Sequence, residues 1–223
     1  MSLYQAIQDK EIPLPSLLSL LLTDEFEEPS LTSVSNALEK NFGEALVYVR
    51  PIDSTVGSFA AEVKVKSEDR DLDYTVTLSY EDDLSTMHYS APGFLDQDIK
   101  AIEKCRRVLN IETSYSHDVL NDYHKHLIFC NKLNCDFVAV LDHAACIIKS
   151  AKWFVDAAEC STPPNPNSLF TIHSVYDEET GQVWMHTHGL LRCHSIEWEI
   201  LNISKDNLDR KSSTDVLTGL PNK

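Results

Sequence analysis

The stretch from Ser168 to Ile203 constrains the fold of this chain more than any other. It reads SLFTIHSVYDEETGQVWMHTHGLLRCHSIEWEILNI. Two runs rich in β-branched and aromatic residues, 169–177 and 182–189, flank the turn sequence EETG, which predicts a β-hairpin. The run SIEWEILNI that follows alternates apolar and polar side chains and predicts a third strand. The sequence therefore predicts an antiparallel sheet at this end of the chain.

The preceding sequence predicts both helices and strands. Residues 27–43 have helical apolar spacing with a stop at Gly43, and three strand-like runs follow at 45–52, 59–67 and 71–81. The apolar segment IPLPSLLSLLL is compatible with a buried strand or with a helix from Ser16, because its prolines deny helical geometry to the residues before them.

In the second half, residues 94–110 predict a helix with Ile99, Ile102 and Val108 on its apolar positions. A second helix is expected from Ser116, a buried strand in CDFVAVLD, and a short helix in AKWFVDAAEC capped by Ser150.

These elements predict an α+β fold with a mixed, mainly antiparallel sheet and helices packed on one side. Two small subdomains are expected. The acidic N-terminal one spans residues 1–92, the C-terminal one spans 93–203 and contains the hairpin, and 204–223 form a polar tail. The boundary is placed where periodicity is lost before Pro92-Gly93. A loop within one continuous sheet explains the same residues equally well.

The charge excludes some classes of partner. The chain holds 35 acidic and 19 basic residues, a formal charge of −16, whereas proteins that bind nucleic acid present clustered Lys and Arg. Residues 1–92 contain 17 acidic and 6 basic residues, a difference of −11. This excess is explained by a solubilising surface, or more specifically by a basic protein partner.

The sequence also predicts a cytoplasmic protein that does not enter a membrane. No run approaches the roughly 18–20 apolar residues that span a bilayer, and the first residues lack the pattern of a signal peptide. The six cysteines form no CxxC pair, and several lie in apolar runs, which is typical of reduced, buried thiols.

The candidate functional residues gather in the second hairpin strand and just after it. They are Trp184, His186, His188, Gly189, Arg192, Cys193 and Glu199. In a strand, His186 and His188 point to the same face, so this pair could bind zinc or iron together with a carboxylate from Asp142, Asp177 or Glu199.

A structural role explains the same motif. Gly189 can take the positive φ of a bend that ends the strand, and Arg192 can pair with Glu197 or Glu199 to fix it. The sequence HTHG resembles the first half of the zinc-isopeptidase signature, but Gly189 replaces its proline, and Ile196 and Glu199 stand where its Ser and Asp belong. Cys193 and His194 cannot form a catalytic pair by adjacency, because neighbours on a strand face opposite ways.

The segments PPNPNSLFTIHSVYDEE and VWMHTHGLLRC resemble the C-terminal region of an uncharacterised bacterial family, number four thousand and twenty-six in the series of domains of unknown function. The shared motif is Trp-x-His-Thr-His-Gly-Leu-x-Arg-Cys, and the resemblance is strongest over residues 163–200. Members have Gly where this chain has His194. The resemblance implies a bacterial cytosolic protein without an established activity, and similar Thr-His-Gly cores look like they belong to toxin-immunity neighbourhoods.

Two functions remain as hypotheses. The first is a non-enzymatic interaction protein of the immunity type, without a cofactor. The alternative is a metal-dependent hydrolase that holds zinc through His186 and His188.

Overall fold

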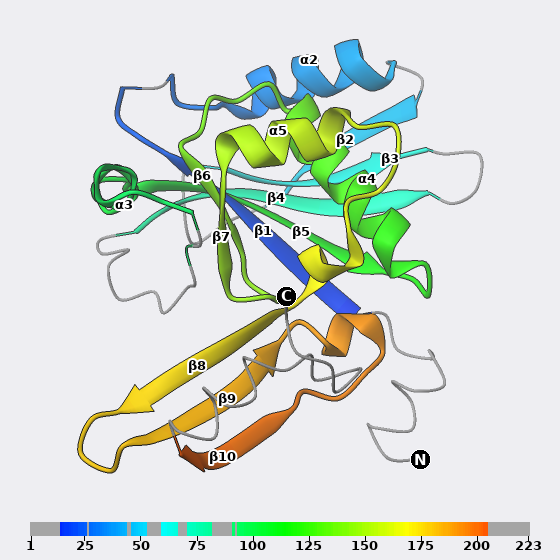
Figure 1. The fold of residues 1–223 in the computed structure, drawn as a ribbon. Coiled ribbons are helices and arrows are strands. Elements are labelled where there is room, and N and C mark those ends of the chain that lie inside the picture. The colour runs from blue at the N-terminus through cyan, green and yellow to red at the C-terminus, as the bar shows by residue number, and fades with distance from the viewer. Residues whose placement is uncertain are drawn as a thin grey trace.

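The computed structural model describes residues 14–25, 27–43, 46–52, 59–66, 71–81, 91 and 93–204, which build two antiparallel sheets (Figure 1). The large sheet has seven strands, which lie side by side in the order β2 (Val47–Pro51), β3 (Phe59–Val65), β4 (Leu72–Tyr80), β5 (Arg107–Tyr115), β1 (Leu14–Leu22), β6 (Ala139–Asp142) and β7 (Ile147–Ser150). The small sheet has the order β10 (Glu199–Ser204), β9 (Gln182–His188) and β8 (Thr171–Asp177).

Four α-helices accompany the large sheet: α2 (Leu31–Phe42), α3 (Asp96–Ile102), α4 (Val119–Lys132) and α5 (Ala151–Glu159). Two short 3-10 helices, η2 (Pro166–Leu169) and η3 (Leu191–Cys193), flank the small sheet. The predicted α+β class with antiparallel strands is confirmed, and so is the predicted hairpin with its third strand.

The large sheet joins residues from both sides of the expected boundary near residue 92. β1 lies between β5 and β6, and β4 pairs with β5 along seven residue pairs. One continuous sheet, the alternative that the sequence left open, describes this arrangement. The segment chosen as the boundary lies largely outside the described residues, as does the expected tail beyond residue 204.

The residues at the two ends of α2 explain where this helix begins and where it ends. The Ser30 side chain accepts a hydrogen bond from Ser33 N at 3.1 Å, and Ser33 Oγ accepts one from Ser30 N at 2.8 Å, so both hydroxyls satisfy helix-start amides. Gly43 ends the helix with φ +94°. Its buried residues, Val34 and Leu38, are one turn apart and face the sheet.

The Leu-rich N-terminal segment, which the sequence allowed to be a strand or a helix, forms the strand β1. Leu18, Leu20 and Leu22 point into the main core, while Leu21 belongs to a second core on the opposite face of the sheet. A strand with apolar residues on both faces can be buried on both sides. Its central place in the sheet follows from this pattern.

The helix predicted over 94–110 is wrong in its second half. The helix α3 ends at Ile102, and Arg107–Tyr115 form the strand β5. The sequence RVLNIETSY also has strand periodicity, since Leu109 and Ile111 enter the main core and Val108 the second one. Pairing with β1 and β4 on either side decides between the two patterns. The four-residue strand β7 was not predicted.

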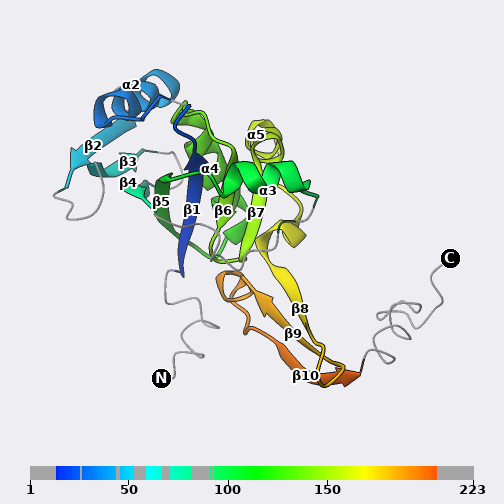
Figure 2. The same ribbon diagram turned by 90° about the vertical axis from the view of Figure 1, so that its left-hand side faces the viewer.

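The helices divide unequally between the two faces of the large sheet. α2, α4 and α5 bury their apolar residues in the main core on one face. The short α3 covers the second, smaller core over β1, β5, β6 and β7 on the other face. Figure 2 shows the small sheet extending away from this body. The part of the second face formed by β2, β3 and β4 carries no described helix.

A buried histidine of α4 makes the stability of this core depend on pH. His126 has no exposed surface, and its Nδ1 is 3.0 Å from the hydroxyl oxygen of Tyr115. Burial lowers the pKa of His126 to about 3, although Asp142 acts in the opposite direction. The unfolded chain has a histidine pKa of about 6.5 and binds more protons between about pH 3 and 6.5. Stability contributed by neutral His126 is therefore lost as the pH falls through this range.

Urea denaturation at pH 7 and pH 5 tests this dependence. The expected loss of unfolding free energy attributable to His126 is about 2 kcal/mol between these two values, from a linkage slope of at most about 1.4 kcal/mol per pH unit. A His126→Asn variant should lose that much less over the same interval. Equal losses in the two proteins would contradict the assignment.

Candidate functional site

The strand β9 ends at a glycine that no other residue can replace without movement. Gly189 has φ +99°, and a Cβ placed on it would lie 2.4 Å from the carbonyl oxygen of Leu169 and 3.3 Å from Cα of Ala145. The conformation and the close approach of backbone both require glycine. The bend thereby packs the Thr-His-Gly turn against the end of η2 and the turn between β6 and β7.

Glu197 holds this bend together from the chain just before β10. Its Oε1 accepts hydrogen bonds from Gly189 N at 2.8 Å and Leu191 N at 3.2 Å, and its Oε2 accepts one from Thr187 Oγ1 at 2.7 Å. Three donors on one carboxylate fix the turned backbone. The expected pairing of Glu197 with Arg192 is wrong, because Glu197 instead accepts these three hydrogen bonds.

Arg192 pairs instead with Asp142, at the end of β6. Nη1 donates to Oδ1 at 2.9 Å, Nη2 donates to Oδ2 at 2.8 Å, and Nε donates to the carbonyl oxygen of Leu169 at 2.7 Å. Only 1% of the Arg192 side chain and none of the Asp142 side chain is exposed. The guanidinium also lies over the ring of Tyr123, 4.9 Å from its centre.

The two parallel hydrogen bonds from Arg192 to Asp142 connect the small sheet to the large one. Burial opposes the charge on Arg192, but the Asp142 carboxylate raises the pKa of the guanidinium above its usual value. Asp142 is therefore the partner that makes a buried arginine tolerable, and it cannot serve as a ligand in a surface metal site. That part of the sequence-based metal hypothesis is wrong.

Three histidines lie together on one face of the hairpin. His173 in β8 is the register partner of His186 in β9, and His188 follows two residues later on the same face. The ring centres of His173 and His186 are 5.5 Å apart, and each is 4.7 Å from that of His188. The ring of Trp184 stacks on that of His186 at 4.1 Å. His173 was not recognised in the sequence, although the hairpin register would have placed it there.

Two of these imidazoles, those of His173 and His188, favour the neutral state. Partial burial lowers the pKa of His173, and the neighbouring His186 lowers it further. Burial also lowers the pKa of His188, and His173 and His186 add to this effect. Like charges at such short distances disfavour protonation of these two rings.

The carboxylates proposed as ligands, on Asp142, Asp177 and Glu199, do not belong to the group of ligand atoms that converge near these rings. Asp177 accepts hydrogen bonds at the hairpin turn from Glu179 N at 2.9 Å and Thr180 Oγ1 at 2.7 Å. Glu199 faces the same side as His186, its register partner. Within the described residues, the ligand atoms that lie within 4.8 Å of one another belong to His173, His186 and His188.

Two models of one protein family match this chain. A family model described as the C-terminal part of a protein of unknown function (DUF4026) matches residues 172–218, and the model of its N-terminal part matches residues 16–164. The chain belongs to the DUF4026 family. The family resemblance seen in the sequence is thus confirmed. Neither a search of curated proteins nor a search of solved structures returned a match.

The two DUF4026 models follow the structural division of the chain. The N-terminal model covers the large sheet and its helices, and the C-terminal model begins within β8. The residues between them, 165–171, include η2 and the Leu169 carbonyl that Arg192 contacts. None of the helices in the described ranges combines the length and apolar character of a membrane-spanning helix.

Two other reactive side chains of this DUF4026 chain, those of Cys193 and Ser19, are not arranged for nucleophilic attack. Burial raises the pKa of the half-buried Cys193 thiol, so this group is not prepared as a thiolate. Ser19 Oγ lies 2.7 Å from His143 Nε2 and donates to Asn110 Oδ1 at 2.5 Å. The histidine therefore donates to the serine instead of withdrawing its proton, and Ser19 is fully buried.

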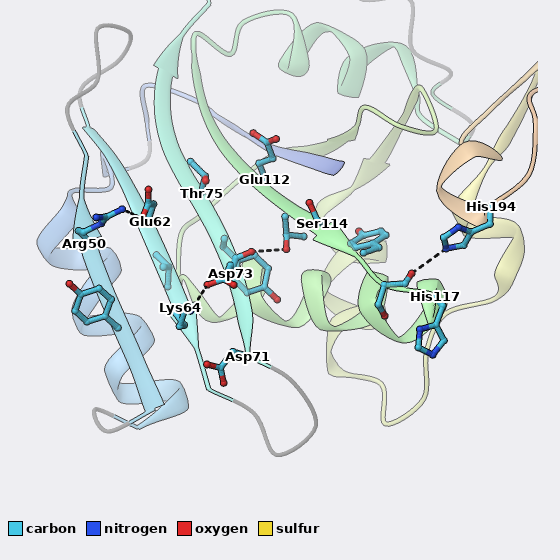
Figure 3. A pocket seen from close by; sticks show the side chains of 16 residues that line it. Arg50, Glu62, Lys64, Asp71, Asp73, Thr75, Glu112, Ser114, His117 and His194 are labelled. Atoms are coloured by element: carbon cyan, nitrogen blue, oxygen red, sulfur yellow. Dashed lines mark hydrogen bonds and ion pairs between the residues drawn. The ribbon is translucent and has the colours of Figure 1, made fainter. Parts of the chain in front are cut away.

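The uncovered face of the large sheet forms a second candidate site, which we call the open face (Figure 3). It is a hollow of about 880 Å³. Side chains from four neighbouring strands line it: Tyr48 and Arg50 of β2, Glu62 and Lys64 of β3, Asp73 and Thr75 of β4, and Glu112 and Ser114 of β5. Asp71, His117 and His194 lie at its margin.

Proposed function

We propose that this DUF4026 protein is a non-enzymatic interaction protein that binds a basic protein partner on the open face. An immunity protein, which binds and neutralises another protein, is the role of this kind that the family resemblance suggests. The observation that carries the proposal is the excess of carboxylates on a broad, uncovered sheet surface.

The charges on the open face do not cancel. Arg50 forms an ion pair with Glu62, and Lys64 Nζ lies 3.3 Å from Asp73 Oδ1. Both cations that line the hollow are therefore neutralised by neighbours on the adjacent strand. Two more carboxylates, on Asp71 and Glu112, line the hollow and are exposed, which leaves a surplus of negative charge. Basic side chains of a partner would complement this surplus and be steered towards it.

The shape of the open face suits a polypeptide better than a small molecule. The side chains that line it are largely polar and come from extended strands, whereas small-molecule sites are usually enclosed and apolar. Tyr48, a residue that is 63% exposed, offers an aromatic side chain. Aromatic residues surrounded by polar groups often provide the anchors of protein interfaces.

A charge reversal at Glu112 tests the proposal. The Glu112→Lys variant should bind a lysine- and arginine-rich peptide about fivefold more weakly than the wild type, equivalent to ~1 kcal/mol for the changed charge. Fluorescence anisotropy at two salt concentrations measures this, and the difference should shrink as salt screens the charges. Glu159→Lys, an equal reversal at an exposed position of α5, provides the control. Equal binding by both variants would contradict a role of the open face.

Metal-dependent hydrolysis is a second candidate function, which the convergence of three imidazoles on the hairpin favours. Zinc bound by three histidines can lower the pKa of a water molecule and make it a nucleophile. Glu199 is the carboxylate nearest in register to act as a base. Hydrolysis of an activated ester should then require added zinc and His188, and zinc-stimulated activity that persists in a His188→Ala variant would contradict this function.

A further inference from the structure

The face of the small sheet that carries His173, His186 and His188 has the features of a metal site. We propose that these three side chains bind one divalent transition-metal ion of the zinc class, with a fourth coordination position left open. The proposal goes beyond the interaction function, because the metal site lies on a different sheet from the open face and neither site needs the other.

The positions of the three side chains follow from the hairpin register. β8 and β9 place His173 opposite His186, and His188 lies next along the same face. Candidate ligand nitrogens of all three lie within 4.8 Å of one another. In a tetrahedral zinc site, Zn–N distances of about 2.0–2.1 Å set nitrogens roughly 3.4 Å apart. Small rotations of these partly exposed rings would close the difference, because no packed side chain separates them.

Two of the ring nitrogens lack the hydrogen bonds that buried polar atoms normally make. Among the described residues, Nε2 of His173 and Nδ1 of His186 are buried and have no hydrogen-bond partner. Buried nitrogen atoms without partners cost free energy, so an explanation is required. A metal ion would accept the lone pairs of both atoms.

The surroundings of His173 also resemble those of metal-binding histidines. The Cys146 backbone carbonyl interacts with the His173 ring, and metal ligands of this type commonly donate their other ring N–H to a carbonyl group. Such a partner orients the ring and selects its tautomer. The Cys146 turn is thereby connected to the proposed site.

The ligand set selects the class of metal. Three neutral imidazoles suit Zn²⁺, Co²⁺, Ni²⁺ or Cu²⁺, whereas Ca²⁺ and Mg²⁺ require mainly oxygen ligands. Sites with three protein ligands keep their fourth position for water or another molecule. Glu199 lies on the same face but outside the converging group, so it is not assigned as a ligand.

Zinc titration of the full-length, tag-free chain tests the proposal. After removal of metal with a chelator, isothermal titration calorimetry should show one Zn²⁺ per chain. Alanine at His173, His186 or His188 should weaken binding by about 100-fold or more, since loss of even a supporting partner costs ~10–100-fold. Glu199→Ala, on the same face, and His117→Ala, an exposed histidine elsewhere, should each change the affinity by less than about tenfold. Circular dichroism without metal checks that every variant is folded.

Two measurements on the wild-type chain do not depend on folding of the variants. Co²⁺ should give the absorption of a nitrogen-coordinated ion without a thiolate charge-transfer band, which separates this site from the six free cysteines. Zinc should also protect the three histidines together from diethyl pyrocarbonate, as mapped by mass spectrometry. A thiolate band, protection of other histidines, or unchanged affinity in all three alanine variants would overturn the proposal.

Discussion

Replacing Arg192 by alanine should lower the free energy of unfolding by about 3–5 kcal/mol, because the Asp142 carboxylate would remain buried without its cation. The side chain of Asp142 has no exposed surface, and Arg192 supplies two of its hydrogen bonds at 2.8 and 2.9 Å. The variant would also lose the contact with the Leu169 carbonyl. Urea denaturation followed by circular dichroism measures the change.

A second variant separates the cost of an unpaired charge from the value of the pair. The double variant Asp142→Leu with Arg192→Met should be less destabilised than Arg192→Ala, because it buries no charge. Lys152→Ala, which removes one side of an exposed ion pair with Asp156, should cost less than about 1 kcal/mol. A loss in Arg192→Ala no larger than that of Lys152→Ala would contradict the role given to the buried pair.

Gly189→Ala should be the second strongly destabilising change, with an expected loss of about 3 kcal/mol or more. A positive φ costs an alanine roughly 1–2 kcal/mol by itself. The added Cβ would also lie 2.4 Å from the Leu169 carbonyl oxygen and 3.1 Å from Cα of Phe170, so backbone must move. Thermal unfolding of the variant should show a clearly lower midpoint.

Gly181→Ala is the matched control for this prediction. Gly181 has φ +66° in the hairpin turn, but a Cβ there would meet no atom within 4 Å. It should therefore show only the conformational cost of about 1–2 kcal/mol. Similar losses in the two variants would mean that close packing at Gly189 contributes nothing.

These two changes give the Thr-His-Gly motif a structural meaning alongside the proposed metal site. Gly189 and Arg192 attach the small sheet to the large one. His186 and His188, in contrast, contact the ring of His173 and each other. Within one short motif, the residues that fix the fold are therefore separable by mutation from those that could bind a ligand.

The sequence predicted the candidate site only in part. The same-face placement of His186 and His188 could be read from strand periodicity, because it depends on residues two positions apart. The partner of Arg192 could not, because Asp142 is fifty positions away and nearer acids such as Glu197 were equally plausible. Glu197 instead accepts hydrogen bonds from the Gly189 bend.

Local features were determined by the sequence alone: the hairpin, the capped helix from Leu31 to Phe42, and the bend at Gly189. They depend on side chains and backbone within a few residues of each other. Only the tertiary structure decided that Arg107–Tyr115 is a strand, since pairing on both sides outweighs helical periodicity. It alone also joined Asp142 to Arg192, fifty positions away. Such contacts between distant residues exist only once the sheets have formed and excluded water from the charged pair.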